Sequence, residues 1–200
     1  MAIQRGIFSS SGRAWLAVIV YTLFLYATLT LAFDIYVWFY NRLGKLFMSC
    51  LMTGLYIPVV LLLLAFLIFR LPRRLDSYVA FGMIGLALGY SLHTIDVPAK
   101  RFHFLQYGPL TVLILDALRF RCRNHFVYMW ALLLVALIGL GDEALQGLLP
   151  NRYFGFQEVV TNTVAGLFAL AFVAFVMGED YYPWGRSRSR KKCWSTPLAR

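Results

Sequence analysis

Charged residues are scarce in this chain. Only 14% of its 200 residues are Asp, Glu, Lys or Arg, against about 25% in a typical soluble domain. Hydrophobic residues make up 60% of the sequence, which is more apolar surface than one soluble core of this length could bury. The composition therefore excludes an ordinary soluble domain and indicates a protein that is partly solvated by lipid.

The residue patterns of common catalytic and metal sites are missing as well. The 3 cysteines, Cys50, Cys122 and Cys193, are an odd number at spacings that fit neither a metal site nor a disulfide framework. There is no Gly-x-Ser-x-Gly motif and no His-Glu-x-x-His motif. The paired glutamates of membrane prenyl-protease relatives are also absent. We therefore expect no disulfides, no bound metal and no cofactor.

The net charge of +10 would suggest nucleic-acid binding in a soluble protein. Here most basic residues stand in short clusters beside apolar runs, as the topology signals of membrane proteins do. We therefore expect membrane lipids, and no nucleic acid, among the partners of this chain.

Long apolar runs divide the chain into candidate membrane helices. A run of roughly 18 or more apolar residues can cross a bilayer, and an isolated segment can cross only as a helix. We predict an all-α transmembrane bundle of six helices, at Trp15–Phe33, Leu46–Phe69, Tyr78–Ile95, Phe104–Phe120, Phe126–Gly141 and Val159–Met177. The fourth run contains Asp116, but it must cross if the flanking basic clusters are to lie on consistent sides.

The basic residues predict how the bundle is oriented. With six spans, most of the 19 Lys and Arg fall at the end that holds both termini. The exceptions, at the opposite end, are Arg42, Lys45, Lys100, Arg101 and Arg152. Because basic loops stay in the cytoplasm, we predict two cytoplasmic termini and outer loops at 34–45, 96–102 and 142–157.

This topology suggests three parts. Residues 1–76 form an N-terminal transmembrane hairpin of two helices, residues 77–180 form a core of four helices, and residues 181–200 form a basic cytoplasmic tail. In the first helix of the core, Gly85 and Gly89 make a Gly-x-x-x-Gly pair, and Gly82 precedes them. This pattern predicts close packing against a neighbouring helix.

Polar side chains gather at the outer ends of the last three predicted helices. Each of these helices carries two polar residues four positions apart, as His103 and Tyr107 are, so the two share one helix face. Polar groups this close to hydrocarbon usually pair or line a wet cavity. We therefore predict one cluster, formed by Lys100, His103, Tyr107, Asp142, Glu143, Gln146, Arg152, Glu158 and Asn162.

Each part of this cluster also has a purely structural interpretation. His103 and Tyr107 can serve as an interfacial pair that hydrogen-bonds the following loop. Asp142 and Glu143 can form an acid pair held by Arg152. The helix macrodipole disfavours acids at a helix C-terminus, so a cation must compensate them in either case.

The same residues resemble the VanZ-like family. The matching string is Lys100-x-x-His103-x-x-x-Tyr107, then Asp142-Glu143-x-x-Gln146, then Arg152, Glu158 and Asn162. The resemblance covers roughly residues 97–177, which leaves the first two helices as an added hairpin. Ala99 stands where the family usually has Asp, and Glu158 replaces another usual Asp. The resemblance implies a cell-envelope protein of the bacterial inner (cytoplasmic) membrane, in a family linked in part to teicoplanin and antibiotic resistance.

The expected function is ligand binding rather than catalysis. Cations, acids and amides beside an apolar wall suit a ligand with a polar head and a lipid tail, such as a lipid-linked cell-wall intermediate or a lipoglycopeptide. One alternative is an enzyme acting on a lipid head group, with His103 or Glu143 as the general base. Another is a scaffold subunit that contacts membrane protein partners through the first three helices.

Overall fold

The computed structural model describes residues 7–71, 74–122, 124–149 and 152–178. Within these ranges all regular secondary structure is helical, as predicted. The elements are α1 (Ser11–Ala27), α2 (Leu29–Gly54), α3 (Tyr56–Arg70), α4 (Leu75–Thr94), α5 (Pro98–Leu118), α6 (Phe126–Leu148), α7 (Phe156–Ala171) and the π-helical turn η1 (Phe172–Met177). Because α2 continues into α3 and α7 into η1, the described residues form six helical units. The predicted basic tail, residues 181–200, lies outside the described residues.

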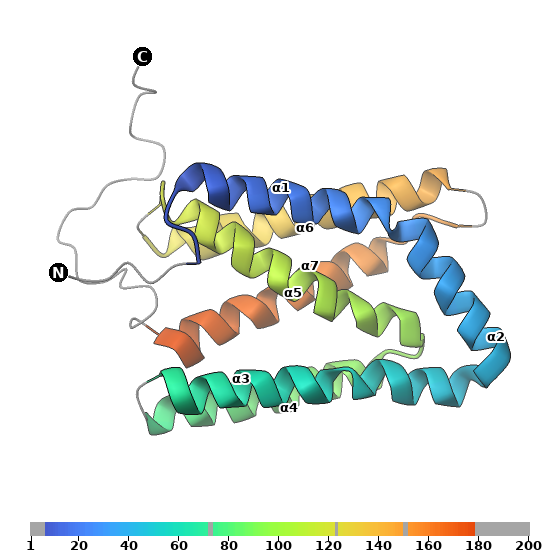
Figure 1. Ribbon diagram of the computed structural model, residues 1–200, viewed down its shortest axis with the longest axis horizontal. Coiled ribbons are helices and arrows are strands. Elements are labelled where there is room, and N and C mark those ends of the chain that lie inside the picture. Colours follow the sequence, from blue (N-terminus) through green and yellow to red (C-terminus); the bar gives the residue numbers. More distant parts are fainter. Residues whose placement is uncertain (1–6, 72–73, 123, 150–151, 179–200) are drawn as a thin grey trace, which may run out of the picture.

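The units run back and forth along one long axis (Figure 1). The start of α1, the α3–α4 and α5–α6 connections and the end of η1 lie at one end, which we name the terminal end. The α1–α2, α4–α5 and α6–α7 connections lie at the opposite, distal end. This alternation is the one that the six predicted spans require.

Four of the units are long and apolar enough to cross a membrane. They are Leu29–Phe69, Leu75–Thr94, Phe126–Leu148 and Phe156–Met177. Helix α1 is apolar but shorter, and α5 is more polar than its neighbours. The described helices therefore indicate a membrane protein, and the more polar α5 must be shielded from lipid.

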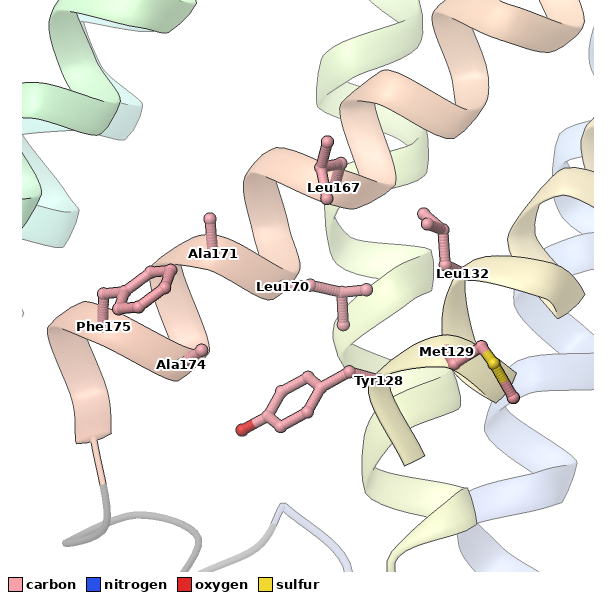
Figure 2. A pocket seen from close by; sticks show the side chains of 8 residues that line it. All are labelled: Tyr128, Met129, Leu132, Leu167, Leu170, Ala171, Ala174 and Phe175. Carbon is pink, nitrogen blue, oxygen red and sulfur yellow. The ribbon is translucent and has the colours of Figure 1, made fainter. Parts of the chain in front are cut away.

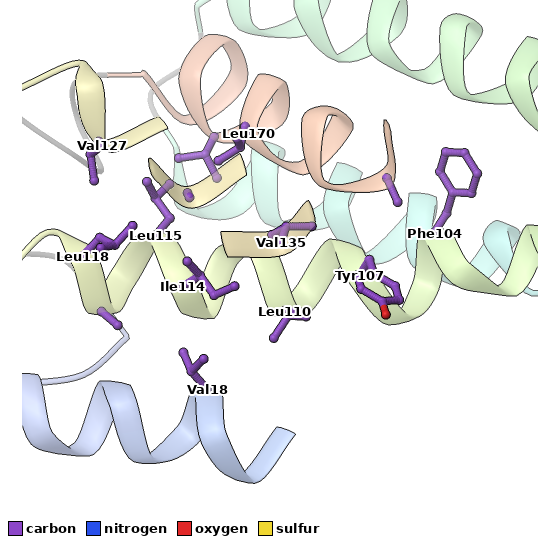
Figure 3. Close-up of a cluster of buried hydrophobic side chains, with 14 of the residues drawn as sticks. Val18, Phe104, Tyr107, Leu110, Ile114, Leu115, Leu118, Val127, Val135 and Leu170 are labelled. Carbon is purple, nitrogen blue, oxygen red and sulfur yellow. The ribbon is translucent and has the colours of Figure 1, made fainter. Parts of the chain in front are cut away.

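That shielding comes from the central position of α5, which packs against α1, α2, α6 and α7. Its side chains Leu110, Ile114 and Leu115 are fully buried, and they meet Val18 of α1 and Val135 of α6 in one core (Figure 3). A helix surrounded by protein does not need an apolar outer face. The low hydropathy of the fourth predicted span is therefore a consequence of its burial.

Several predicted boundaries are wrong by about one or two turns. Helix α5 begins earlier than predicted, with Pro98 in its first turn. Proline is tolerated there, because backbone N–H groups in the first turn have no acceptor within the helix. Helix α6 continues past Gly141 to Leu148, and α7 begins at Phe156. Residues treated as loop on account of their polarity are helical, because their polar side chains find partners inside the bundle.

The first predicted span and the loop 34–45 also need correction. Helix α1 ends at Ala27, and the chain then turns at Thr28 into the first half of α2. Figure 1 shows this half crossing the distal end of the bundle, before the chain turns again and runs back along the bundle as the second half of α2 and α3. The second turn is at Gly44, whose φ of 78° and ψ of 170° interrupt the helical backbone.

Replacing Gly44 with alanine is expected to lower the free energy of unfolding by about 1–3 kcal/mol, because this backbone region is essentially restricted to glycine. No neighbouring atom would obstruct the added methyl group, so the loss reports backbone strain alone. Chemical unfolding in detergent measures the effect. The matched control is Gly54→Ala, at a helical position that is equally open, where no loss is expected.

The predicted close packing of the α4 glycines is wrong. Gly82, Gly85 and Gly89 are exposed, and a Cβ added at any of them would meet nothing within 4 Å. Close helix contacts occur instead at Gly139 of α6, against Asn162, and at Gly166 of α7, against Thr111 and Val135. A Gly-x-x-x-Gly spacing shows where a helix could approach another closely. Whether it does so depends on which helix faces the fold turns inward.

Asp116 is fully buried at the terminal end, although it lies in an otherwise apolar run. Its carboxylate accepts hydrogen bonds from the backbone N–H groups of Ile7 (3.2 Å) and Phe8 (3.0 Å). Its Oδ1 also lies 2.7 Å from Nε of Arg119, which donates a further hydrogen bond to the carbonyl of Phe8. This carboxylate therefore fixes the segment before α1 to the end of α5.

The expectation of no disulfides is wrong for one cysteine. Cys50 is free and exposed, whereas Cys122 is buried and disulfide-bonded. Spacing along the sequence does not show which thiols folding brings together.

Candidate functional site

The structure gathers the predicted polar residues at the distal end, on α5, α6, α7 and the loop between α6 and α7. An outer group surrounds Glu158, which lies in the first turn of α7. One of its carboxylate oxygens lies 3.4 Å from Nζ of Lys100, and the other lies 3.4 Å from Nε2 of His103. Lys100 and Glu158 therefore form an ion pair at the outer edge of the cluster.

An inner group surrounds the neighbouring carboxylates of Asp142 and Glu143, which are both buried. The Tyr107 hydroxyl donates to Asp142 at 2.7 Å, and the Gly155 N–H donates to Glu143 at 3.0 Å. The amide nitrogen of Gln146 lies between the two acids, 3.3 Å from Asp142 and 3.1 Å from Glu143. Neutral donors therefore compensate the acids at this helix C-terminus, where the macrodipole disfavours them.

Arg152 does not hold the acid pair directly. Its guanidinium donates to the side-chain oxygen of Gln146 and lies over the ring of Phe33, 4.5 Å from the ring centroid. Within the part of the chain that the structure describes, Asp142, Glu143 and Arg152 form no ion pair. The predicted pairing of Arg152 with Asp142 or Glu143 is therefore wrong, and Gln146 links the two charges instead.

The outer and inner groups are continuous. The rings of His103 and Tyr107 are 6.2 Å apart on successive turns of α5. Glu143 is also close enough to Glu158 and His103 to interact electrostatically with both. One connected cluster thus extends from the half-exposed Lys100 to the buried acids.

Two members of the cluster keep unused hydrogen-bonding atoms. Asn162 is fully buried, and both its Oδ1 and its Nδ2 lack a partner. It packs against Gly139, one turn before the acid pair on α6. The Nδ1 of His103 is likewise buried without a partner. A buried polar atom left unpaired costs about 1–3 kcal/mol, so these atoms mark places where a water or a ligand can bind.

The cluster becomes more accessible toward the end of the bundle. The side chains of Lys100, Glu158 and His103 are 29%, 20% and 13% exposed, whereas Asp142 and Asn162 are buried. Among the described residues no group of three or more His, Cys, Asp or Glu has a geometry for metal binding.

Sequence reasoning missed Arg101, which follows Lys100 but is buried. Its guanidinium donates to the Ile95 carbonyl (2.9 Å), to Oγ of Ser49 (2.7 Å) and to Oγ1 of Thr53 (2.7 Å). Tyr56 of α3 donates to the Arg101 carbonyl. Arg101 therefore fixes α2 and the α4–α5 connection beside Lys100. In the sequence it resembled the other basic loop residues that were used only to predict the orientation of the bundle.

Tyr26 of α1 was also missed. Its hydroxyl donates to the Ile138 carbonyl at 2.7 Å and lies so close to Gly141 that a Cβ there would come within 2.6 Å of the oxygen. Because Gly141 directly precedes Asp142, this contact brings α1 next to the acid pair. The N-terminal hairpin thus contributes to the surroundings of the site.

An open apolar groove of about 340 Å³ lies apart from the cluster, between α6 and the α7–η1 unit (Figure 2). Its lining includes Tyr128 and Leu132 from α6 and Leu170 and Phe175 from the α7–η1 unit. It lies toward the terminal end of the bundle, because these residues come from the start of α6 and the end of the α7–η1 unit. Apart from the hydroxyl of Tyr128, the side chains that line the groove are apolar.

No family model, curated protein or solved structure matches this chain. The likeness to the VanZ-like family therefore depends on the motif residues themselves.

Proposed function

We propose that this chain is a VanZ-like protein of the bacterial inner membrane that binds the polar head of an amphipathic ligand at the outer face. The observation that carries the proposal is the fully buried Asn162, whose amide has no partner within a connected cluster of charged and polar side chains. A protein stabilised by packing alone gains nothing from such an amide. A binding site gains selectivity, because a ligand that pairs with it removes the penalty.

The chemistry of the cluster favours a head group that both donates hydrogen bonds and carries an anion. Asp142, Glu143 and Glu158 are acceptors for hydroxyl and amide donors. Lys100 and Arg152 are the cations, and Arg152 has no acidic partner among the described residues. Sugar or peptide groups attached to a phosphate meet both requirements. A lipid-linked cell-wall intermediate fits this description best, and a lipoglycopeptide such as teicoplanin offers the same donors on a lipid tail.

Binding to protein in lipid nanodiscs tests the proposal. A lipid-linked cell-wall intermediate and teicoplanin are titrated separately, with plain phospholipid as the reference. The variant Asn162→Leu should weaken binding of the true ligand about 5- to 100-fold, which corresponds to one buried hydrogen-bonding group. The control is Thr161→Val, because the exposed Thr161 hydroxyl bonds only to Gln157 of its own helix. Equal affinity of the wild type and Asn162→Leu for both probes would contradict the proposal.

A second candidate function rests on His103. Its Nε2 faces the carboxylate of Glu158 while its Nδ1 is unpartnered, and a histidine oriented by an acid is a common general base. Glu143 suits this role less well, since both of its oxygens already accept hydrogen bonds. Turnover of a lipid head group that is lost in His103→Asn while affinity is retained would favour an enzyme. Parallel loss of affinity would favour a binding protein.

A scaffold role predicts neither a loss of turnover nor a loss of ligand affinity in His103→Asn. Only 11% of the most apolar 18-residue stretch of α4 is buried inside the bundle. The same share is buried in the most apolar stretch of the α2–α3 unit. These helices therefore leave wide apolar faces for lipid or for membrane protein partners. In a scaffold, His103→Asn would leave ligand affinity unaffected, and only the recovery of a protein complex would respond to changes on α3 or α4.

A further inference from the structure

The first half of α2, Leu29–Leu43, runs in a different direction from the other helices. It crosses the distal end of the bundle, from the end of α1 to the start of the long α2–α3 segment (Figure 1). A break at Thr28 and the positive φ of Gly44 separate it from the helices on either side. If the long helices cross the membrane, this segment lies at the level where they leave it.

Its inner face contacts the distal ends of the other helices. Phe33 lies beneath the guanidinium of Arg152, and Tyr36 lies beside the backbone of Ala99, next to Lys100. Tyr40 continues this face one turn later, with its ring 5.7 Å from that of Tyr36. The segment therefore covers one side of the polar cluster.

Its outer surface is divided into two stripes. Thr30, Asp34 and Asn41 are exposed and lie along one line of the helix, which the half-buried Val37 also shares. A second line, about one quarter turn away, consists of Leu31, Ile35 and Trp38, which are 60%, 49% and 56% exposed. A helix surrounded by lipid has no reason to carry the polar stripe, and a helix surrounded by water has no reason to expose the apolar one.

We propose that Leu29–Leu43 is an interfacial helix, which lies in the plane of the membrane at the distal end and inserts Leu31, Ile35 and Trp38 among the lipid head groups and upper acyl chains. Tryptophan is enriched at this depth. Arg42, stacked 5.4 Å from the ring centroid of Trp38, supplies a cation for lipid phosphates there. The inner face then connects the membrane surface to the polar cluster through Phe33 and Arg152. This inference holds whether or not the cluster binds a ligand.

Depth-dependent quenching of Trp38 tests this placement. Trp15, Trp130, Trp184 and Trp194 are replaced by phenylalanine, and the protein is reconstituted in vesicles of brominated phosphatidylcholine. The largest loss of Trp38 emission is expected from bromines near the lipid carbonyls. The largest loss from bromines near the chain ends would mean a spanning segment. Quenching by aqueous iodide alone would mean an aqueous loop. Either of these results overturns the proposal.

A second measurement covers the case in which the single-tryptophan chain does not fold. Nitroxide labels are attached, one at a time, to cysteines introduced at Asp34 and at Ile35, with the free Cys50 replaced by serine. The label at 35 should be more accessible to oxygen, which concentrates in lipid, and the label at 34 more accessible to a water-soluble nickel chelate. Equal accessibility at the two adjacent positions would contradict the interfacial placement.

Discussion

Replacing Asp116 with alanine is expected to lower the free energy of unfolding by about 3–5 kcal/mol, the usual range when one partner of a buried ion pair is removed. The substitution leaves Arg119 without its 2.7 Å carboxylate contact. It also leaves the N–H groups of Ile7 and Phe8 without their acceptor. Chemical unfolding in detergent, followed by circular dichroism, measures the loss.

The exposed Asp34 provides the control for this substitution. Asp34→Ala removes the same group from a position that makes no hydrogen bond or ion pair within the described chain, so a change of less than about 0.5 kcal/mol is expected. An equally small change in Asp116→Ala would show that the segment before α1 is not held by this carboxylate.

Replacing Arg101 with methionine is expected to cost about 3 kcal/mol, because Ser49, Thr53 and the Ile95 carbonyl all lose a charged donor. Methionine keeps most of the apolar length of the side chain, so the loss reports the hydrogen bonds. The same unfolding measurement applies. Since Arg101 fixes the chain next to Lys100, ligand affinity is expected to fall in this variant as well.

Arg42 provides the control for the substitution of Arg101. It is exposed and contacts only the ring of Trp38 among the described residues, so Arg42→Met should cost less than about 1 kcal/mol. Arg101→Lys keeps the charge but loses the planar fork of donors. Full stability in Arg101→Lys would mean that charge alone, and not the multiple hydrogen bonds, accounts for the contribution of Arg101.

The site could be predicted from the sequence because helical spacing fixes which residues share a face. His103 with Tyr107, and Glu158 with Asn162, each stand one turn apart, and alternating spans bring their helix ends to the same level. The partners within the cluster could not be predicted. Whether Arg152 meets Asp142 or Gln146 depends on the path of the α6–α7 loop, and spacing does not determine that path.

The direction of the first half of α2 could not be predicted from the sequence for a different reason. The apolar run continues without interruption from Trp15 to Phe33, so hydropathy gives no sign of the turn at Thr28. After the turn, Phe33 contacts Arg152, and a tertiary contact of this kind leaves no mark in the hydropathy. The glycines of α4 show the same limit, since a small-residue pattern does not reveal whether a helix face will be covered.

Labelling of a cysteine at Tyr153 by a membrane-impermeant maleimide tests most directly whether the polar cluster faces outward. Tyr153 is 90% exposed in the α6–α7 loop beside the cluster. Leu75, which is 78% exposed at the start of α4, marks the terminal end. With the free Cys50 replaced by serine, we expect Tyr153→Cys to react in intact spheroplasts and Leu75→Cys to react only after lysis. The reverse pattern would place the cluster in the cytoplasm and contradict the proposed capture of an outer-face ligand.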